Sequence, residues 1–169
     1  KLILMTAHRR ESFGEGFVRI CEAVRRLAGR GDVEIVYPVH PNPNVRRVVE
    51  RMLGGIEGVR LIEPLDYVPF VDLMRRADIL LTDSGGVQEE GPSFGKPILV
   101  MRDKTERQEA VEAGAATLVG TDPERIVAEA GRLLDSGEAR AAFTRVRNPF
   151  GDGQASGRIL DAIHSFLGS

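Results

Sequence analysis

The stretch "ILLTDSGGVQEEGPSFGKPILVM" (residues 79–101) decides the fold of this chain. Its two apolar ends, Ile79–Thr82 and Pro97–Met101, have the length and composition of buried strands. Between them, "SGGVQEEGPSFG" (84–95) predicts a turn that runs into a short helix. A strand, a helix and a second strand in this order are typical of parallel strands joined by a crossover.

The same alternation runs along the rest of the chain. Short apolar runs predict four more strands, at Leu2–Met5, Val33–Tyr37, Val59–Ile62 and Ala116–Val119. Apolar residues at helical spacing predict helices within residues 17–27, 45–53, 71–76, 107–113, 123–134 and 155–167. Continuous apolar strands separated by helices predict an α/β fold: a three-layer α/β/α Rossmann-like domain with a mostly parallel sheet of about six strands.

The bulk properties narrow the classes of function. The 169 residues fit one domain of ordinary size, and the net charge of −2 gives no electrostatic footprint for nucleic acid. One cysteine, Cys21, excludes an internal disulfide, and no His, Asp or Glu spacing indicates a metal, so we expect neither a metal site nor a cofactor. No apolar run approaches the roughly 20 residues that span a bilayer, so we expect no membrane association and a reducing, cytoplasmic setting. The chain opens on Lys1 inside an apparent strand, which indicates a domain from a longer protein.

Three polar clusters directly follow predicted strands. They are "TAHRRE" (6–11), "PVHPNPN" (38–44) and "TDSGG" (82–86). Ligands of open parallel sheets bind beyond the carboxyl ends of the strands, which all lie on one rim. We therefore expect these three clusters to lie close together on the ligand-binding rim.

The "TDSGG" cluster has the features of an anion site. Free backbone N–H groups at a helix start favour an anion, and Gly85 and Gly86 leave room for a phosphate to approach the backbone. Ser84 could donate to a phosphate oxygen, or it could only cap the helix. Further along, Glu89 and Glu90 could accept hydrogen bonds from a ribose diol, although for one of the pair a solvated helix face is the better interpretation.

The "TAHRRE" cluster could also bind a diphosphate. His8 and Arg10 supply positive charge and hydrogen-bond donors, and Glu11 would orient an arginine. A surface salt-bridge cluster is the alternative, but its position on the ligand rim favours function. Arg102 and Arg107 follow the strand after "TDSGG" and could reach the same anion.

An aromatic residue, Phe70, precedes the Ile79–Thr82 strand in "LDYVPF" (65–70). It could stack on a base, or it could simply pack in the core. From the residues alone, the chain is an α/β domain that binds a nucleotide diphosphate with His8 near the phosphates. The reaction is not determined at this level.

The sequence strongly resembles the non-hydrolysing UDP-N-acetylglucosamine 2-epimerases. The resemblance runs through nearly all of the chain, in order, and rests on "TAHRRESFG" (6–14), "HPNPNVR" (40–46), "TDSGGVQEEGPSFGKPILVMRDKTERQEAVEAG" (82–114), "LVGTD" (118–122) and "NPFGDGQASGRI" (148–159). It implies the two-domain GT-B architecture, with residues 1–169 as the C-terminal, UDP-binding domain and the N-terminal domain absent. It also implies a homodimer for the full-length protein.

The resemblance implies a reaction and a set of site residues. The reaction is the reversible interconversion of UDP-N-acetylglucosamine and UDP-N-acetylmannosamine, through elimination of UDP and its re-addition to the other face. The matching positions are His8 as the active-site histidine, Leu65 (backbone) and Phe70 at uracil, Ser84, Gly85 and Gly86 at the phosphates, Glu90 at ribose, and Arg107 as a ligand contact. Many bacterial members bind a second UDP-N-acetylglucosamine as an activator, and Arg9 and His40 match positions of that allosteric site.

The resemblance also sets a limit, because the family's acidic catalytic residues lie in the N-terminal domain. We therefore expect this chain to bind UDP weakly and not to epimerise by itself. Three alternatives stay open: a GT-B glycosyltransferase that shares the UDP site, a hydrolysing epimerase that releases N-acetylmannosamine and UDP, and an isolated nucleotide-binding domain without catalysis.

Overall fold

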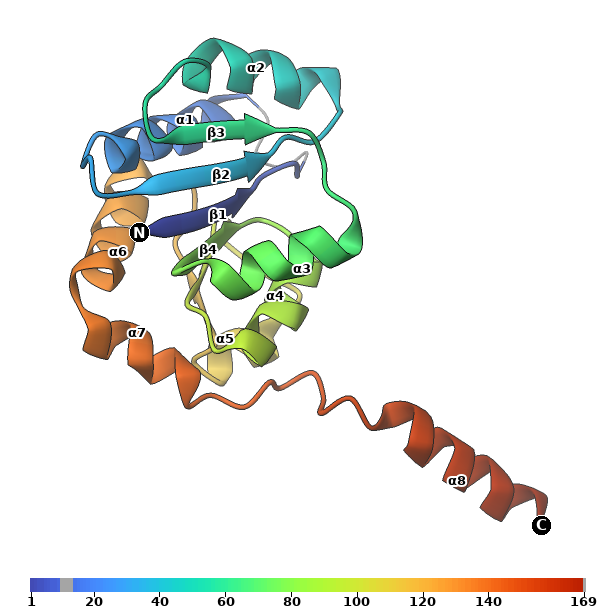
Figure 1. Ribbon diagram of the computed structural model, residues 1–169. Helices are drawn as coiled ribbons and strands as arrows, with labels where there is room; N and C mark the ends of the chain where they lie inside the picture. The colour runs from blue at the N-terminus through green and yellow to red at the C-terminus, as the bar shows by residue number, and fades with distance from the viewer. Residues whose placement is uncertain (10–13, 169) are drawn as a thin grey trace.

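A six-stranded parallel sheet forms the centre of the computed structural model, which describes residues 1–9 and 14–168 (Figure 1). The strand order is β3-β2-β1-β4-β5-β6, and every neighbouring pair is parallel. The strands are β1 (Leu2–Thr6), β2 (Glu34–Pro38), β3 (Val59–Ile62), β4 (Ile79–Thr82), β5 (Ile98–Val100) and β6 (Ala116–Leu118). The predicted sheet is confirmed.

Helices cover both faces of this sheet, as the three-layer prediction requires (Figure 1). One face packs against α1 (Glu15–Ala28), α2 (Pro43–Leu53) and α6 (Pro123–Asp135); the other packs against α3 (Tyr67–Arg76), α4 (Gly85–Glu90) and α5 (Gln108–Glu112). β1 shows why both layers form: Ile3 and Met5 join the first cluster of buried side chains, and Leu4 joins the second. Because side chains alternate along a strand, an unbroken apolar run fills both cores.

The sheet order places a topological switch between β1 and β4. The chain runs outward from β1 to β3 and then returns to β4 before running outward the other way, so the loops after β1 and β4 diverge. Thr6 and Thr82 are register partners, and their hydroxyl oxygens lie 2.6 Å apart. The Asp83 N–H donates to the Thr6 carbonyl at 3.1 Å. These bonds bring the chain just after β1 beside the chain just after β4.

Three local predictions have different outcomes. The helix predicted at 71–76 begins earlier, at Tyr67, because Pro69 falls in the first turn, where its missing N–H has no intrahelical partner to lose. Asp122 caps α6 as predicted, accepting the Glu124 N–H at 3.2 Å. Ser84 stands at the N-cap of α4, but its side chain makes no capping hydrogen bond.

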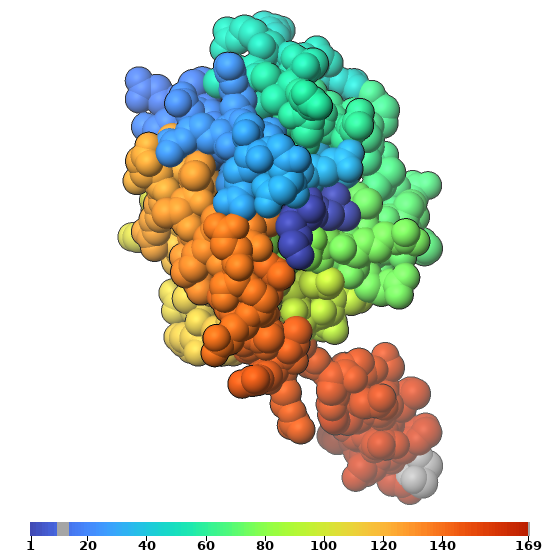
Figure 2. All heavy atoms as spheres, turned by 60° about the vertical axis from the view of Figure 1, so that its left-hand side comes forward, coloured from blue at the N-terminus to red at the C-terminus, as the bar shows by residue number. Residues whose placement is uncertain are grey.

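The C-terminal part of the chain extends away from the sheet. α7 (Gly137–Thr144) follows α6, and the chain then leads to α8 (Ala155–Leu167), which projects from the domain and buries no residue (Figures 1 and 2). Earlier in the chain, the short 3-10 helix η2 (Gly91–Phe94) follows α4 and completes the "SGGVQEEGPSFG" turn. Among the described residues, no helix is both long enough and apolar enough to cross a bilayer.

Gly91 sits where the layer containing α4 meets the sheet, and this contact yields a stability prediction. A Cβ on Gly91 would lie 2.7 Å from Ile98 Cδ1 and 2.9 Å from Leu80 Cδ1. Both neighbours are fully buried, so Gly91→Ala should lower the free energy of unfolding by about 1–3 kcal/mol through overpacking. Chemical denaturation measures the change. In Gly131→Ala the new methyl has room and the helix gains propensity, so equal or higher stability is expected there.

Candidate functional site

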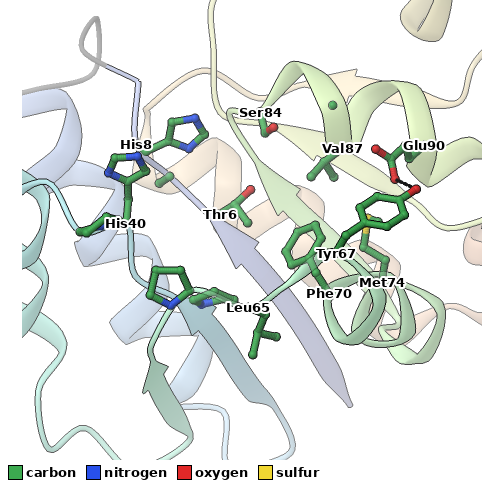
Figure 3. Close-up of a pocket in the computed structure, with 15 residues that line it drawn as sticks. Thr6, His8, His40, Leu65, Tyr67, Phe70, Met74, Ser84, Val87 and Glu90 are labelled. Carbon is green, nitrogen blue, oxygen red and sulfur yellow. Dashed lines mark hydrogen bonds between the residues drawn. The ribbon is translucent and has the colours of Figure 1, made fainter.

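A cavity of about 320 Å³ opens at the carboxyl ends of β1, β2 and β4, at the switch point of the sheet (Figure 3). Its lining comes from all three predicted polar clusters and from the start of α3. The lining residues are Thr6, Ala7, His8, Pro38, His40, Pro41, Pro64, Leu65, Tyr67, Phe70, Met74, Ser84, Gly86, Val87 and Glu90. The prediction that the three clusters meet on one rim is confirmed.

The cavity has two chemically different sides. His8 and His40 lie on one side, and Phe70, Met74 and Leu65 form an apolar wall opposite them (Figure 3). Ser84 stands between these sides, at the start of α4. A flat aromatic ligand fits the apolar wall, and charged groups fit the side with imidazoles and backbone N–H groups.

His8 is fixed from two directions. Its Nδ1 lies 3.3 Å from Asp83 Oδ1, and its ring stacks on His40 with centroids 5.3 Å apart and planes 12° from parallel. His40 is itself fixed, because its Nδ1 accepts the Asn42 N–H at 3.1 Å. An Nδ1 that accepts a hydrogen bond carries no proton, so the neutral His40 ring is protonated on Nε2. This arrangement leaves the Nε2 of His8 as the nitrogen available to a ligand.

The backbone at the start of α4 is open to a ligand. Ser84 N–H donates to Thr82 Oγ1 at 2.9 Å, which fixes the turn. A Cβ on Gly86 would have Ser84 Oγ, at 3.8 Å, as its nearest neighbour, so this glycine lies beside open space on the cavity side. The geometry suits close approach of an anion to the backbone, as expected from the two glycines.

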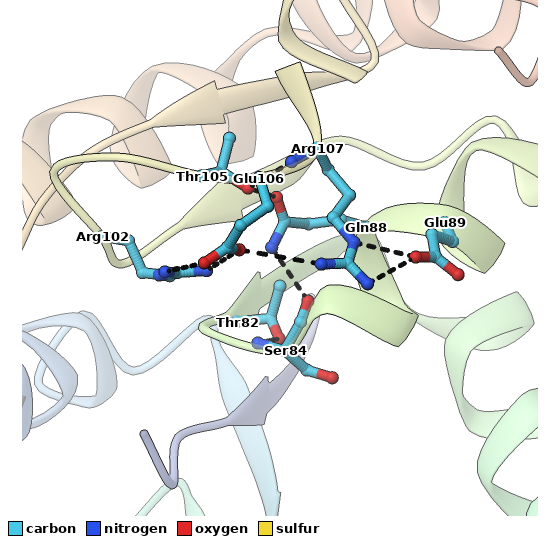
Figure 4. Close-up of polar contacts among 8 residues, drawn as sticks. All are labelled: Thr82, Ser84, Gln88, Glu89, Arg102, Thr105, Glu106 and Arg107. Atoms are coloured by element: carbon cyan, nitrogen blue, oxygen red, sulfur yellow. Dashed lines mark hydrogen bonds and ion pairs between the residues drawn. The ribbon is translucent and has the colours of Figure 1, made fainter. Parts of the chain in front are cut away.

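Arg107 does not line the cavity but packs against the start of α4 (Figure 4). A Cβ on Gly85 would lie 2.9 Å from Arg107 Cζ, so Gly85 makes room for the guanidinium. Arg107 Nε donates to Glu89 Oε1 at 2.8 Å, and the Thr105 hydroxyl donates to Gln88 Oε1 at 2.6 Å beneath this pair. The structure thus brings Gly85 and Arg107 together one layer behind the cavity wall.

The two neighbouring glutamates of α4 have different partners. Glu89 pairs with Arg107, whereas Glu90 lines the cavity and accepts the Tyr67 hydroxyl at 3.0 Å (Figures 3 and 4). This hydrogen bond raises the pKa of Tyr67. Of the pair, only Glu90 is therefore placed to meet a ligand in the cavity.

The remaining basic residues lie elsewhere. Arg102 is buried, with its side chain 6% exposed, and binds Glu106 through two hydrogen bonds of 2.7 and 2.9 Å. Arg9 does not line the cavity; its backbone N–H donates to Asp83 Oδ2 at 2.7 Å. The roles predicted for Arg10 and Glu11 lie outside the described residues.

Sequence reasoning missed two residues of this site. Asp83 is fully buried and binds the loop after β1, and Tyr67 holds Glu90. Asp83 could have been found, because a carboxylate directly after an apolar strand and before "SGG" needs buried partners. Tyr67 could not have been found in this way, because the sequence predicts that this helix begins at residue 71, after Tyr67. Among residues 1–9 and 14–168, no group of three or more His, Cys, Asp or Glu side chains could hold a metal ion.

The fold and site together define a class: a doubly wound α/β domain with its ligand cavity at the switch point between β1 and β4. Residues 1–164 match the family model described as UDP-N-acetylglucosamine 2-epimerase. The chain belongs to that family.

Known relatives agree with this assignment. The chain is 58% identical to the UDP-N-acetylglucosamine 2-epimerase of Escherichia coli K12, over 96% of this chain and 44% of the relative. Among solved structures, it resembles Staphylococcus aureus MnaA in complex with UDP, with a TM-score of 0.94, 46% identity, and coverage of 99% of this chain and 46% of that one. The Neisseria meningitidis UDP-GlcNAc 2-epimerase bound to UDP-GlcNAc gives a TM-score of 0.93 and 44% identity, over 98% of this chain and 45% of that one. The chain spans less than half the length of these relatives.

The Arg102–Glu106 pair beside the site gives a pH prediction. The Arg102 guanidinium lowers the pKa of Glu106 from 4.5 to about 2. A lowered folded-state pKa adds stability above the unfolded value, and that stability is lost as the pH falls through the folded value. The stability advantage of the wild type over Glu106→Gln should therefore be full above about pH 5, should fall progressively toward about pH 2 and should vanish below that value.

Urea denaturation at a series of pH values measures this difference. Glu109→Gln, which removes an exposed carboxylate from α5, is the matched control and should show a smaller pH-dependent difference. If the difference in free energy of unfolding between wild type and Glu106→Gln stays constant between about pH 5 and 2, the prediction is wrong.

Proposed function

We propose that this chain is the C-terminal, UDP-binding domain of a non-hydrolysing UDP-N-acetylglucosamine 2-epimerase of GT-B architecture. The full-length enzyme interconverts UDP-N-acetylglucosamine and UDP-N-acetylmannosamine by eliminating UDP and adding it back. One observation carries the proposal: His8, the start of α4 at Ser84 and Gly86, Glu90 and an apolar wall converge on one cavity. That combination matches the diphosphate, the ribose and the base of a nucleotide.

Each part of UDP has a proposed place in the cavity. Uracil lies against Phe70 and the backbone of Leu65, on the apolar wall. The ribose hydroxyls donate to Glu90, in place of or beside the Tyr67 hydroxyl that holds this carboxylate now. Stacking on Phe70 and a carboxylate for the diol would favour a nucleoside over a simple phosphate.

The diphosphate lies at the start of α4. Gly85 and Gly86 present backbone N–H groups there, and Ser84 can donate from its hydroxyl, because its N–H is bonded to Thr82 Oγ1. The Arg107 guanidinium behind Gly85 adds positive charge. Glu89 neutralises part of that charge and fixes the direction of the guanidinium. We propose that Arg107 acts on the phosphates from this position through its charge, from behind the cavity wall.

His8 is the proposed catalytic residue of this domain. Elimination of UDP breaks the bond between the sugar and the diphosphate, and negative charge builds on the leaving oxygen. An imidazolium donating from Nε2 stabilises that charge. Proton transfer at C2 of the sugar requires further acid–base groups within hydrogen-bond reach. We propose that these groups come from an N-terminal domain, because the relatives are about twice as long as this chain.

The C-terminal segment is a proposed contact with that N-terminal domain. α8 carries five exposed apolar side chains: Ile159, Leu160, Ile163, Phe166 and Leu167. Upstream, the Asn148 amide donates to the Glu89 carbonyl at 2.9 Å and to Ser93 Oγ at 2.7 Å, so the segment leaves the domain from a fixed point near α4. Burial of the apolar stripe by the second domain would offset its exposure here.

We also propose an activating site that includes His40 and Arg9. His40 stacks on His8, so a second UDP-N-acetylglucosamine in contact with His40 would adjoin the catalytic imidazole. Arg9 is tied to the same region through its backbone bond to Asp83. For the full-length enzyme we propose a homodimer in the cytoplasm, a compartment in keeping with the free, buried thiol of Cys21.

A GT-B glycosyltransferase is the competing activity, and a glycotransferase of kitacinnamycin shares the fold at 19% identity with a TM-score of 0.63. Incubation of the full-length protein with UDP-N-acetylglucosamine alone separates the possibilities. An epimerase yields UDP-N-acetylmannosamine without any acceptor. A hydrolysing enzyme releases free N-acetylmannosamine and UDP. With a transferase, no epimer is formed.

The phosphate position can be tested with Ser84→Asp in this chain. A carboxylate at this position keeps a good N-cap but repels the diphosphate, so UDP affinity should fall at least about tenfold, roughly 1.4 kcal/mol. Isothermal calorimetry with UDP and with uridine measures the effect, and uridine affinity should stay within about twofold of wild type because it carries no phosphate. Ser165→Asp adds the same charge on exposed α8 as the control. Equal UDP affinities for the two variants would refute the placement.

The division of the active site predicts that this chain alone binds UDP without turnover. No acid–base group for C2 is supplied by the residues proposed to contact UDP, so the epimerisation rate should be at least about 10³-fold below that of the full-length enzyme. Chromatography of UDP-N-acetylglucosamine after incubation with the purified chain measures it. Turnover by the chain near the full-length rate would overturn the proposed division.

A further inference from the structure

A buried carboxylate, Asp83, connects the two loops that form the cavity. It follows β4 and has no solvent exposure. Its Oδ2 accepts two backbone N–H groups from the loop after β1, from His8 at 2.8 Å and from Arg9 at 2.7 Å. These two bonds place the loop after β1 directly over the end of β4.

The second oxygen of this carboxylate faces the His8 ring. Asp83 Oδ1 lies 3.3 Å from His8 Nδ1, and among residues 1–9 and 14–168 it has no hydrogen-bond partner. A buried carboxylate oxygen without a donor is unfavourable, and the Nδ1–H of His8 is the donor within reach. Asp83 anchors the loop through Oδ2 alone. Loop anchoring therefore does not explain why Oδ1 faces the imidazole.

The surroundings of His8 favour one protonation pattern. A proton on Nδ1 completes the contact with Asp83, whereas a lone pair on Nδ1 would face a carboxylate lone pair and be repelled. His40 covers one face of the ring and limits its rotation. Nε2 is then left free for the cavity, as in sites where a carboxylate fixes the tautomer of a catalytic imidazole.

We infer that Asp83 is a positioning residue for His8: it holds the imidazole with Nδ1–H toward Oδ1 and turns Nε2 toward the cavity, where the imidazolium form can donate from Nε2. This inference rests on the proposed function for the role of Nε2, but the tautomer itself does not. Asp83 touches no ligand in this scheme and acts only through His8. It also fixes the His8 and Arg9 backbone, so one carboxylate sets both the path of the loop and the chemistry of the ring.

The tautomer can be read directly in the unliganded chain. Histidine labelled with ¹⁵N gives distinct resonances for protonated and unprotonated ring nitrogens, and a His8→Gln variant assigns the His8 signals. At about pH 8, where an ordinary imidazole is neutral, wild-type His8 should carry its proton on Nδ1. In Asp83→Asn the amide oxygen can still accept the backbone N–H groups, but the NH₂ faces Nδ1 and should reverse the tautomer.

Asp78→Asn is the matched control. Asp78 also accepts a backbone N–H from β1, that of Leu2 at 2.9 Å, but it does so at the far end of the strand from the cavity. This variant removes one carboxylate charge from another backbone contact of β1 and should leave the His8 tautomer unchanged. A reversal in Asp78→Asn as well would show a general effect of charge or stability and would overturn the inference.

Two further outcomes would overturn it. One is a proton on Nε2 of neutral wild-type His8; the other is an unchanged tautomer in a folded Asp83→Asn. If Asp83→Asn does not fold, the wild-type tautomer alone decides between the two patterns. Failure of the proposed function has a different signature, because a chain that binds no UDP would still show the Nδ1–H tautomer.

Discussion

The pairing of β1 with β4 is the constraint on which the site depends. The two strands are distant in sequence, yet Thr6 and Thr82 are register partners with hydroxyls in contact. Because the chain leaves β1 and β4 in opposite directions along the sheet, a cavity opens between their loops without any special loop geometry. His8 and Ser84, which face the proposed diphosphate from either side, each stand two residues beyond that paired register. Their separation is therefore set by backbone hydrogen bonds of the sheet, which are far stiffer than a surface loop.

Three acidic side chains lie near the proposed anion site. Free carboxylates there would repel an anionic ligand. Each of them has a partner that redirects it. Asp83 accepts two backbone N–H groups, Glu89 pairs with Arg107, and Glu90 accepts the Tyr67 hydroxyl away from the start of α4. The acidic groups thus orient basic groups and loop backbone, and the start of α4 keeps its positive character. This explains how a cavity suited to a diphosphate can occur in a chain of net charge −2.

More of the fold than of the site could be predicted from the sequence. Every strand and the meeting of the three polar clusters followed from apolar runs and from the rule for parallel sheets, because those depend on periodicity alone. Tertiary partners could not be read in the same way. Nothing in "SGGVQEE" distinguishes Glu89 from Glu90; the choice is made by where Arg107 and Tyr67 arrive from other parts of the chain. Likewise Asp83 gains its two backbone donors only when β1 lies beside β4.

The proposed reaction has two chemical requirements: stabilisation of the leaving diphosphate and proton transfer at C2. In our proposal, each requirement is met by a different domain. In this proposal, fixed dipoles and an imidazole at the end of a rigid sheet stabilise the leaving diphosphate. Removing and returning a proton at C2 requires further acid–base groups within hydrogen-bond reach, which we propose come from the second domain. Contacts to UDP alone can stabilise the leaving group, but they do not move the proton at C2. Catalysis in this scheme therefore begins only when a second domain brings its acids over the cavity that β1 and β4 define.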